Sequence, residues 1–178
     1  MANWIPTIMG SVSSRPGLRV VWADPRGCAY ELLNEVYRVD ETDDSTIRRK
    51  GSCLCGTVTF DVVGRIAGVG SCHCSKCRKV SGTAGNAQFI VGVRRFRWLG
   101  GREHIVSFKL PDGWGSSRCG RCGSPLPDSF DGGKRMWVPA GLMDDALDTN
   151  IVQHIFCGSR ADWDRESPDA RHYHEYPA

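Results

Sequence analysis

Cys72-His-Cys74-Ser-Lys-Cys77 is the most informative segment of the sequence, because it places three thiols within six residues. Two further pairs flank it along the chain, Cys53-Leu-Cys55 and Cys119-Gly-Arg-Cys122. The N-terminus has no basic leader followed by an apolar core, so we expect a cytoplasmic protein with reduced thiols. Clustered cysteines in such a protein are typically metal ligands rather than disulfides.

The spacing of the seven clustered cysteines predicts two zinc sites. Structural zinc takes four ligands, usually as two pairs from separate segments, and Cys53/Cys55 is the pair available to Cys119/Cys122. Cys72, Cys74 and Cys77 would then hold a second zinc with an open position for water or substrate. The spacing of the cysteines leaves other ligand sets open. The second site could be completed by His73, Cys28 or Cys157, or the chain could hold a single structural zinc and spare thiols.

The composition bounds the fold class. A chain of 178 residues with 40% hydrophobic and 24% charged residues is typical of one folded domain. Its 21 glycines and 9 prolines disfavour a helix bundle and favour short strands joined by tight turns. A net charge of +3 gives no reason to expect a nucleic-acid partner, and no apolar run is long enough for a membrane helix.

Hydrophobic periodicity indicates a mainly antiparallel β domain with long, metal-tied loops. The pattern after residue 51 is that of short strands separated by glycine-containing turns. We expect strands over 57–62, 87–91, 96–99, 104–110, 136–139 and 151–156. We expect one short helix, over 75–80.

Residues 1–50 differ from the rest and form a predicted short α/β extension of unknown role. They carry seven basic and seven acidic residues, so the positive charge of the chain lies beyond them. A strand is expected over 18–22 and a helix over 28–37, followed by a charged linker over 40–50. The predicted boundary is therefore 1–50 for the extension and 51–178 for the zinc-binding domain.

Several polar residues near the motifs have two interpretations. Lys76, Arg78 and Lys79 could offset the charge of three thiolates or attract an anionic substrate, or they could be solvated basic residues. Arg160 could bind a substrate carboxylate or make a surface ion pair. His154 and Trp163 are expected in core or turn packing.

The three motifs with their neighbours resemble the glutathione-dependent formaldehyde-activating enzyme (GFA) family, whose domain is shared with centromere protein V. The resemblance covers about residues 51–178 and includes Pro139-Ala-Gly-Leu-Met-Asp-Asp and the stretch from His154 to Trp163. It implies several coiled antiparallel sheets in a β-tent-like GFA fold. It also implies two Zn²⁺ per chain: a structural zinc on Cys53, Cys55, Cys119 and Cys122, and a catalytic zinc on Cys72, Cys74 and Cys77.

The resemblance implies a carbon–sulfur lyase whose partners are a small thiol such as glutathione and an aldehyde, with S-hydroxymethylglutathione formed from glutathione and formaldehyde. A zinc with an open position suits this chemistry, because it lowers the pKa of a bound thiol. The alternative function is a binding module in which both zincs are structural and the domain contacts another macromolecule. The sequence indicates no oligomeric state.

Overall fold

Two three-stranded antiparallel sheets form part of the fold in the computed structural model, which describes residues 47–176. One has the order β1-β2-β5, with strands at Arg48–Ser52, Thr59–Val63 and Phe96–Gly100. The other has the order β6-β7-β8, with strands at Ile105–Lys109, Gly115–Cys119 and Pro125–Leu126. Each strand is short because a glycine- or proline-containing turn follows within a few residues.

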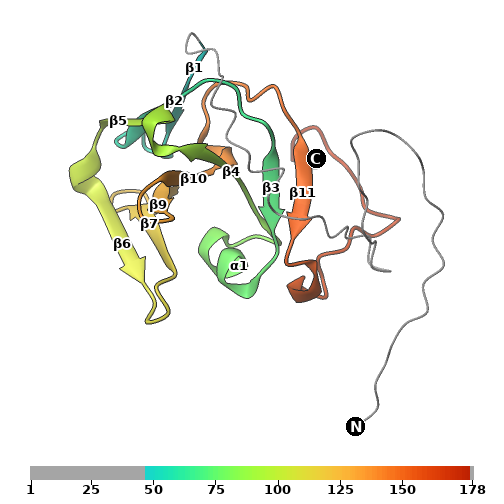
Figure 1. Ribbon diagram of the computed structural model, residues 1–178. Helices are drawn as coiled ribbons and strands as arrows, with labels where there is room; N and C mark the ends of the chain where they lie inside the picture. The colour runs from blue at the N-terminus through green and yellow to red at the C-terminus, as the bar shows by residue number, and fades with distance from the viewer. Residues whose placement is uncertain (1–46, 177–178) are drawn as a thin grey trace, which may run out of the picture. The chain divides into compact units, whose positions relative to one another are not determined.

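A five-stranded sheet lies beside them in the order β11-β3-β4-β10-β9 (Figure 1). Its strands are Ile151–Ile155, Val69–Cys72, Asn86–Gly92, Arg135–Pro139 and Asp128–Phe130. The single α-helix of the described residues, α1 at Ser75–Ser81, follows β3 directly. Short 3-10 turns lie at Val93–Arg95 (η1), Arg102–His104 (η2), Ala140–Leu142 (η3) and Cys157–Ser159 (η4).

This mainly β architecture confirms the predicted fold class. The six expected strands are β2, β4, β5, β6, β10 and β11, and the expected helix is α1. No described helix is long and apolar enough to cross a membrane. The elements expected over 18–22 and 28–37 lie outside the described residues.

One expectation about the chain path was wrong. Arg48–Lys50 is not linker but the first part of β1, whose register pairs Arg48 with Val63 and Ser52 with Thr59. The expected boundary at residue 51 therefore falls inside a strand. The predicted mainly antiparallel pairing is confirmed, with one parallel pair: β11 runs parallel to β3, with Ile155 opposite Cys72. A strand that arrives more than seventy residues after its partner does not need a hairpin, so either direction is open to it.

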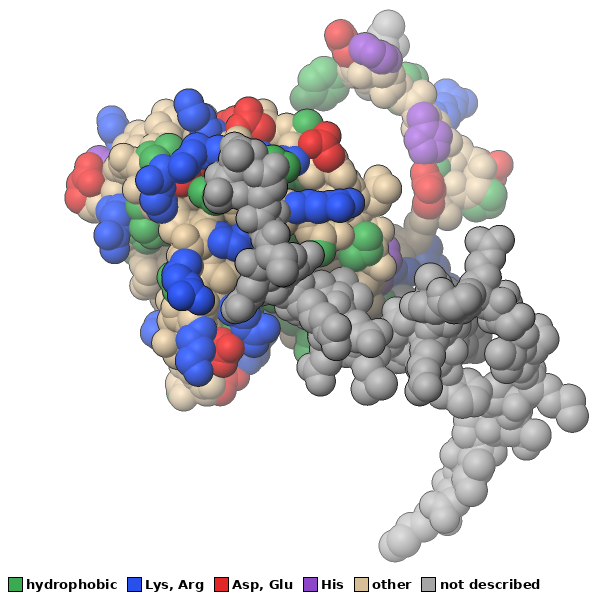
Figure 2. Space-filling view, turned by 45° about the horizontal axis from the view of Figure 1, so that its top comes forward, with side chains coloured by type: hydrophobic (Ala, Val, Ile, Leu, Met, Phe, Trp, Pro, Cys, Tyr) green, Lys and Arg blue, Asp and Glu red, His purple; other side chains and the backbone are tan. Residues whose placement is uncertain are grey.

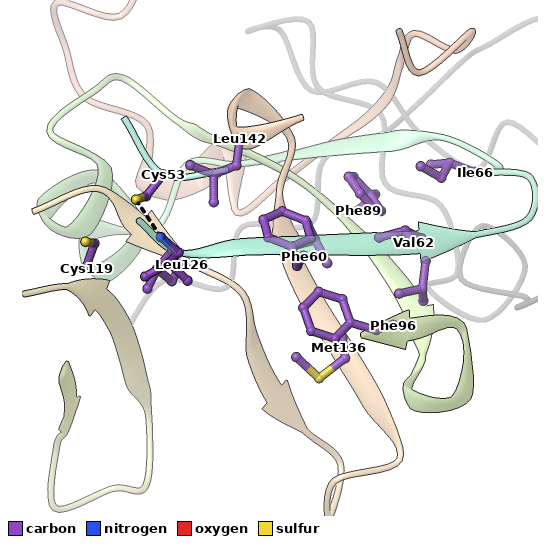
Figure 3. Packing of buried hydrophobic residues seen from close by; sticks show 13 residues of the cluster. Cys53, Phe60, Val62, Ile66, Phe89, Phe96, Cys119, Leu126, Met136 and Leu142 are labelled. Atoms are coloured by element: carbon purple, nitrogen blue, oxygen red, sulfur yellow. Dashed lines mark hydrogen bonds between the residues drawn. The ribbon is translucent and has the colours of Figure 1, made fainter. Parts of the chain in front are cut away.

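The hydrophobic core is built from strands of all three sheets (Figure 3). Alternate residues of β4 and β10 point into it, among them Phe89 and Val138, which are 1% and 0% exposed. Phe60 of β2 stacks on Phe96 of β5 with ring centroids 5.3 Å apart. Cys53 and Cys119 belong to the same buried cluster, so the core reaches the first cysteine motif.

A buried carboxylate interrupts the apolar pattern of β2. Asp61 is 1% exposed and lies between the guanidinium groups of Arg48 and Arg97, on the two flanking strands. Hydrogen bonds from Arg97 lower the pKa of Asp61, and Arg48 lowers it further. The carboxylate is therefore ionised across the neutral range and ties β1, β2 and β5 together.

Candidate metal centres

The four-cysteine cluster consists of Cys53, Cys55, Cys119 and Cys122, whose sulfurs all lie within 4.8 Å of one another. Cys53 and Cys55 follow β1, whereas Cys119 ends β7. The Sγ atoms of Cys53 and Cys55 are 3.5 Å apart and those of Cys55 and Cys119 are 4.0 Å apart. Zinc–sulfur bonds of about 2.3 Å in a tetrahedron separate the sulfurs by about 3.8 Å, so these residues fit a zinc ion.

Matching turns shape the two halves of this cluster. Gly56 donates its N–H to the carbonyl of Cys53 at 2.8 Å, and Gly123 donates to the carbonyl of Cys119 at 2.8 Å. Both glycines have positive φ, 71° and 77°, which a residue with a Cβ adopts at a cost.

Local hydrogen bonds favour thiolates at the solvent side of the four-cysteine cluster. Hydrogen bonds from the side chain and backbone of Ser124 lower the pKa of Cys122 to about 5. Thr57 lowers the pKa of Cys55 in the same way, while burial raises that of Cys53. Because metals bind thiolates rather than thiols, this arrangement favours metal binding.

The three-cysteine cluster consists of Cys72, Cys74 and Cys77, also within 4.8 Å of one another. Cys72 is the last residue of β3, Cys74 is the N-cap of α1 and Cys77 lies in its first turn. The backbone N–H of Cys77 donates to the sulfur of Cys74 at 3.4 Å, so the helix start brings these two cysteines together. Among the described residues, no fourth Cys, His, Asp or Glu ligand atom joins this group.

Hydrogen bonding also gives Cys72 and Cys77 different pKa values. Cys72 accepts a hydrogen bond from Cys77, which lowers the pKa of Cys72 to about 6 and raises that of Cys77. Cys72 and Cys77 are 3% and 6% exposed. The donor set is three soft sulfurs, which suits zinc rather than a hard cation.

Of the three residues considered as a fourth ligand, the two that the structure describes, His73 and Cys157, do not join the three-cysteine cluster. His73 is 4% exposed, and its ring nitrogens contact other groups: Nδ1 lies 2.9 Å from Oδ2 of Asp164 and Nε2 lies 2.9 Å from Nδ1 of His154. Cys157 is buried, 2% exposed, and belongs to neither cluster. Cys28 lies outside the described residues.

This histidine network holds the C-terminal segment against the cysteine loop. Arg160 pairs with Asp164 at 3.3 Å and lies 3.5 Å from Nε2 of His73. His154 thus has a specific partner, and burial lowers its pKa. Asp164 was missed by sequence reasoning, because 91 residues separate it from His73 and no motif marks it. Trp163, expected in packing, is 64% exposed instead.

The basic residues of the cysteine loop have partners of their own. Arg78 donates to the carbonyls of His73, at 2.7 Å, and Ser159. Lys76 pairs with Asp112, and its ammonium lies 5.8 Å from the centre of the Trp114 ring. Lys79 is exposed. Arg78 therefore braces the loop.

The side chain of Arg118 links the two clusters, and a cavity borders the four-cysteine cluster. Arg118 donates to the carbonyl of Gly123, at 3.1 Å, in the turn of the four-cysteine cluster. It also donates to the carbonyl of Val80, in the helix that carries Cys77. A cavity of about 720 Å³ is lined by Cys53 and by residues that follow α1, including Asn86, whose backbone pairs with Cys72. This volume is within the range of small-ligand sites.

Fold and clusters together define a class: a β-sheet protein with two separate cysteine clusters able to hold metal ions. The sequence profile of the glutathione-dependent formaldehyde-activating enzyme family matches residues 48–159, and the chain belongs to this family. The chain is also similar to a solved structure of a Rhodobacter sphaeroides protein, at 18% identity and a TM-score of 0.47. That match covers 57% of this chain and 98% of the other.

Proposed function

We propose that the protein is a zinc-dependent enzyme of the carbon–sulfur lyase type that acts on the adduct of a small thiol and an aldehyde. Formation of S-hydroxymethylglutathione from glutathione and formaldehyde is the reaction that the family's name favours. The observation that carries the proposal is the three-cysteine cluster. Its three sulfurs converge without a fourth protein ligand atom among the described residues.

The roles of the seven cysteines follow from their surroundings. Cys53, Cys55, Cys119 and Cys122 would hold a structural zinc, because four sulfurs complete its coordination. Cys72, Cys74 and Cys77 would hold the second zinc. When bound there, that ion supplies a Lewis-acid position at which a thiol loses its proton more readily.

The protein's own side chains would orient the reactants. Arg78 and the His73–Asp164 contact fix the backbone of the cysteine loop, so the three thiolates keep one geometry. The cavity beside Asn86 also offers Ser52, Ser81 and Thr83 as hydrogen-bonding groups for the polar part of a thiol substrate. Leu54, which is 87% exposed, gives that cavity an apolar wall.

Exchange spectroscopy on mixtures of formaldehyde and glutathione tests the proposal. The zinc-loaded wild type should accelerate exchange between free formaldehyde and the adduct, and Cys74→Ala should not. Lys79→Ala is the matched control, because Lys79 is an exposed residue of the same helix and should leave the exchange rate unchanged. Absence of acceleration by the wild type, with two zinc ions bound, would instead favour a binding module.

A further inference from the structure

A second cavity lies away from both cysteine clusters. It has a volume of about 710 Å³ and is bounded by η1 and by the turn between β9 and β10. The strand β4 runs from Asn86, opposite Cys72, to Gly92, which lines this cavity. Seven residues of strand extend over about 20 Å, so the cavity is remote from the three-cysteine cluster.

Positive charge dominates the cavity. Of the described residues that line it, four are basic and one is acidic: Arg94, Arg95, Lys134 and Arg135 against Asp131. Like charges this close repel one another unless an anion lies between them. We propose that this cavity binds phosphate groups.

Two of the four cations, Arg135 and Arg95, are held by contacts within the protein. Asp131 binds Arg135 through Nε at 3.1 Å and Nη2 at 3.0 Å, and the guanidinium lies 4.8 Å from the centre of the Phe130 ring. Arg95 donates to the carbonyls of Val63 and Arg65 at 2.7 and 2.6 Å. The guanidiniums of Arg95 and Arg135 are thereby held in place, which lowers the entropic cost of binding an anion.

The other two cations are available for a ligand. Arg94 and Lys134 are exposed and make no ion pair within the described part of the chain. They lie next to each other, since the backbone N–H of Val93 donates to the carbonyl of Lys134 at 2.9 Å. An arginine fork and a lysine ammonium are the usual pair of groups that bind a phosphate.

The excess of charge continues onto the neighbouring sheet. Arg48 and Arg97 share the single carboxylate of Asp61, and their side chains are 43% and 58% exposed. Arg48 is the register partner of Val63, whose carbonyl accepts from Arg95. The end of the molecule that carries β1 and β2 comes forward in Figure 2, where Lys and Arg side chains outnumber Asp and Glu. The net charge of +3 conceals this concentration.

Two kinds of ligand could bring a phosphate group to this cavity: a phosphorylated small molecule and the backbone of a nucleic acid. The test uses the full, zinc-loaded chain with two probes: inorganic pyrophosphate in titration calorimetry, and a short labelled oligodeoxythymidine in fluorescence anisotropy. Arg94→Ala/Lys134→Ala should weaken binding at least about tenfold, because two charge-assisted contacts are lost. Arg102→Ala/Lys109→Ala removes the same charge from two exposed residues outside the cavity, and should change binding less than about twofold.

The results with the two probes distinguish a small phosphorylated ligand from a nucleic acid, and they can also show that the cavity binds no phosphate. Pyrophosphate binding that matches oligonucleotide binding identifies a small phosphorylated ligand. Oligonucleotide binding alone, falling steeply between about 50 and 200 mM salt, identifies a nucleic-acid backbone. Failure of both probes to bind the wild type, or equal weakening by the two double variants at unchanged melting temperature, would overturn the proposal. Neither variant touches a cysteine cluster, so the result is independent of the proposed enzyme activity.

Discussion

The two cysteine clusters use the same ligand atom but have different relations to the core. Cys53 and Cys119 are 2% and 1% exposed and belong to the main hydrophobic cluster, together with Phe60 and Leu126 (Figure 3). The cysteines of the other cluster are absent from it, although Cys72 and Cys77 are buried. A metal in the first cluster therefore joins β1, β7 and the core, while one in the second joins a strand end to one helical turn. We therefore expect loss of metal from the first cluster to affect folding and loss from the second to affect the proposed activity.

The largest expected effect is that of Cys119→Ala. Binding of a structural zinc contributes on the order of 10 kcal/mol or more to folding, comparable to the whole stability of a domain. We expect the variant to be unfolded or to melt at a sharply lower temperature, with both metals lost. Circular dichroism and metal analysis measure this. Unchanged melting with full zinc content would show that the four-cysteine cluster has no structural role.

Cys74→Ala is the opposite case. It removes one of three ligands and the N-cap of α1, whose loss costs about 1 kcal/mol. We expect zinc content to fall from two ions to one and the melting temperature to fall by about 2–4 °C. Calorimetry and metal analysis on the same sample check both. A melting temperature as low as that of Cys119→Ala would erase the distinction between the clusters.

A chelator should remove zinc from the three-cysteine cluster faster than from the four-cysteine cluster. Three protein ligands and an exchangeable fourth bind zinc less tightly than four thiolates, so we expect release in two phases of equal amplitude. The fast phase should be missing in Cys74→Ala, and the wild type should stay folded after it. A colorimetric chelator records the kinetics while circular dichroism follows the fold. A single phase accompanied by unfolding is the contrary result.

Asp61→Asn tests how much the ion pairs of Asp61 with Arg48 and Arg97 stabilise the fold without any metal. The amide keeps the shape but leaves Arg48 and Arg97 without their carboxylate, and we expect a loss of about 1–3 kcal/mol. Because its pKa is lowered in the folded state, the carboxylate stabilises the wild type fully above the ordinary pKa of about 4. Its contribution disappears as the pH falls through the lower, folded-state pKa. Urea unfolding at several pH values should show the two proteins converging in acid, and a constant difference would rule out ionisation as the cause.

The smallest expected effect is removal of residues 1–46. All seven clustered cysteines and β1 lie beyond this segment, so we propose that zinc stoichiometry and the order of metal release stay unchanged. The shortened chain should begin at Ile47, because a start at residue 51 would remove most of β1. Metal analysis compares it with the full chain. Loss of zinc would assign part of the segment to the zinc-binding domain.

Sequence patterns predicted the strands that alternate apolar and polar residues. They also predicted both cysteine clusters, because the short spacing within each pair or triplet of cysteines is a local property of the sequence. They failed where tertiary context decides. β1 begins Arg48-Arg49-Lys50, in which Arg48 and Arg49 pair with Asp61 and Asp148 and the backbone N–H of Lys50 donates to Asp145. These partners lie outside the strand itself. β3 and β7 contain glycine and serine, poor strand formers that the sheet accepts through its neighbours.

Contacts between residues far apart in the sequence also escaped prediction at the cysteine loop and at the basic cavity. The contact between His73 and Asp164 and the basic cavity near Arg94 join residues that no local spacing connects. The four cations of the cavity come from two turns about forty residues apart, and a whole-chain net charge averages them away.

Cadmium-113 NMR of the cadmium-substituted chain can distinguish the two cysteine clusters, because the chemical shift of each bound ion reports its own ligands. We expect two resonances, one from four sulfurs and one from three sulfurs with an oxygen or nitrogen atom as the fourth ligand. Glutathione should move only the second, which should be the one missing in Cys74→Ala. A single resonance, or two four-sulfur resonances that glutathione leaves in place, would contradict the division into a structural and a catalytic site.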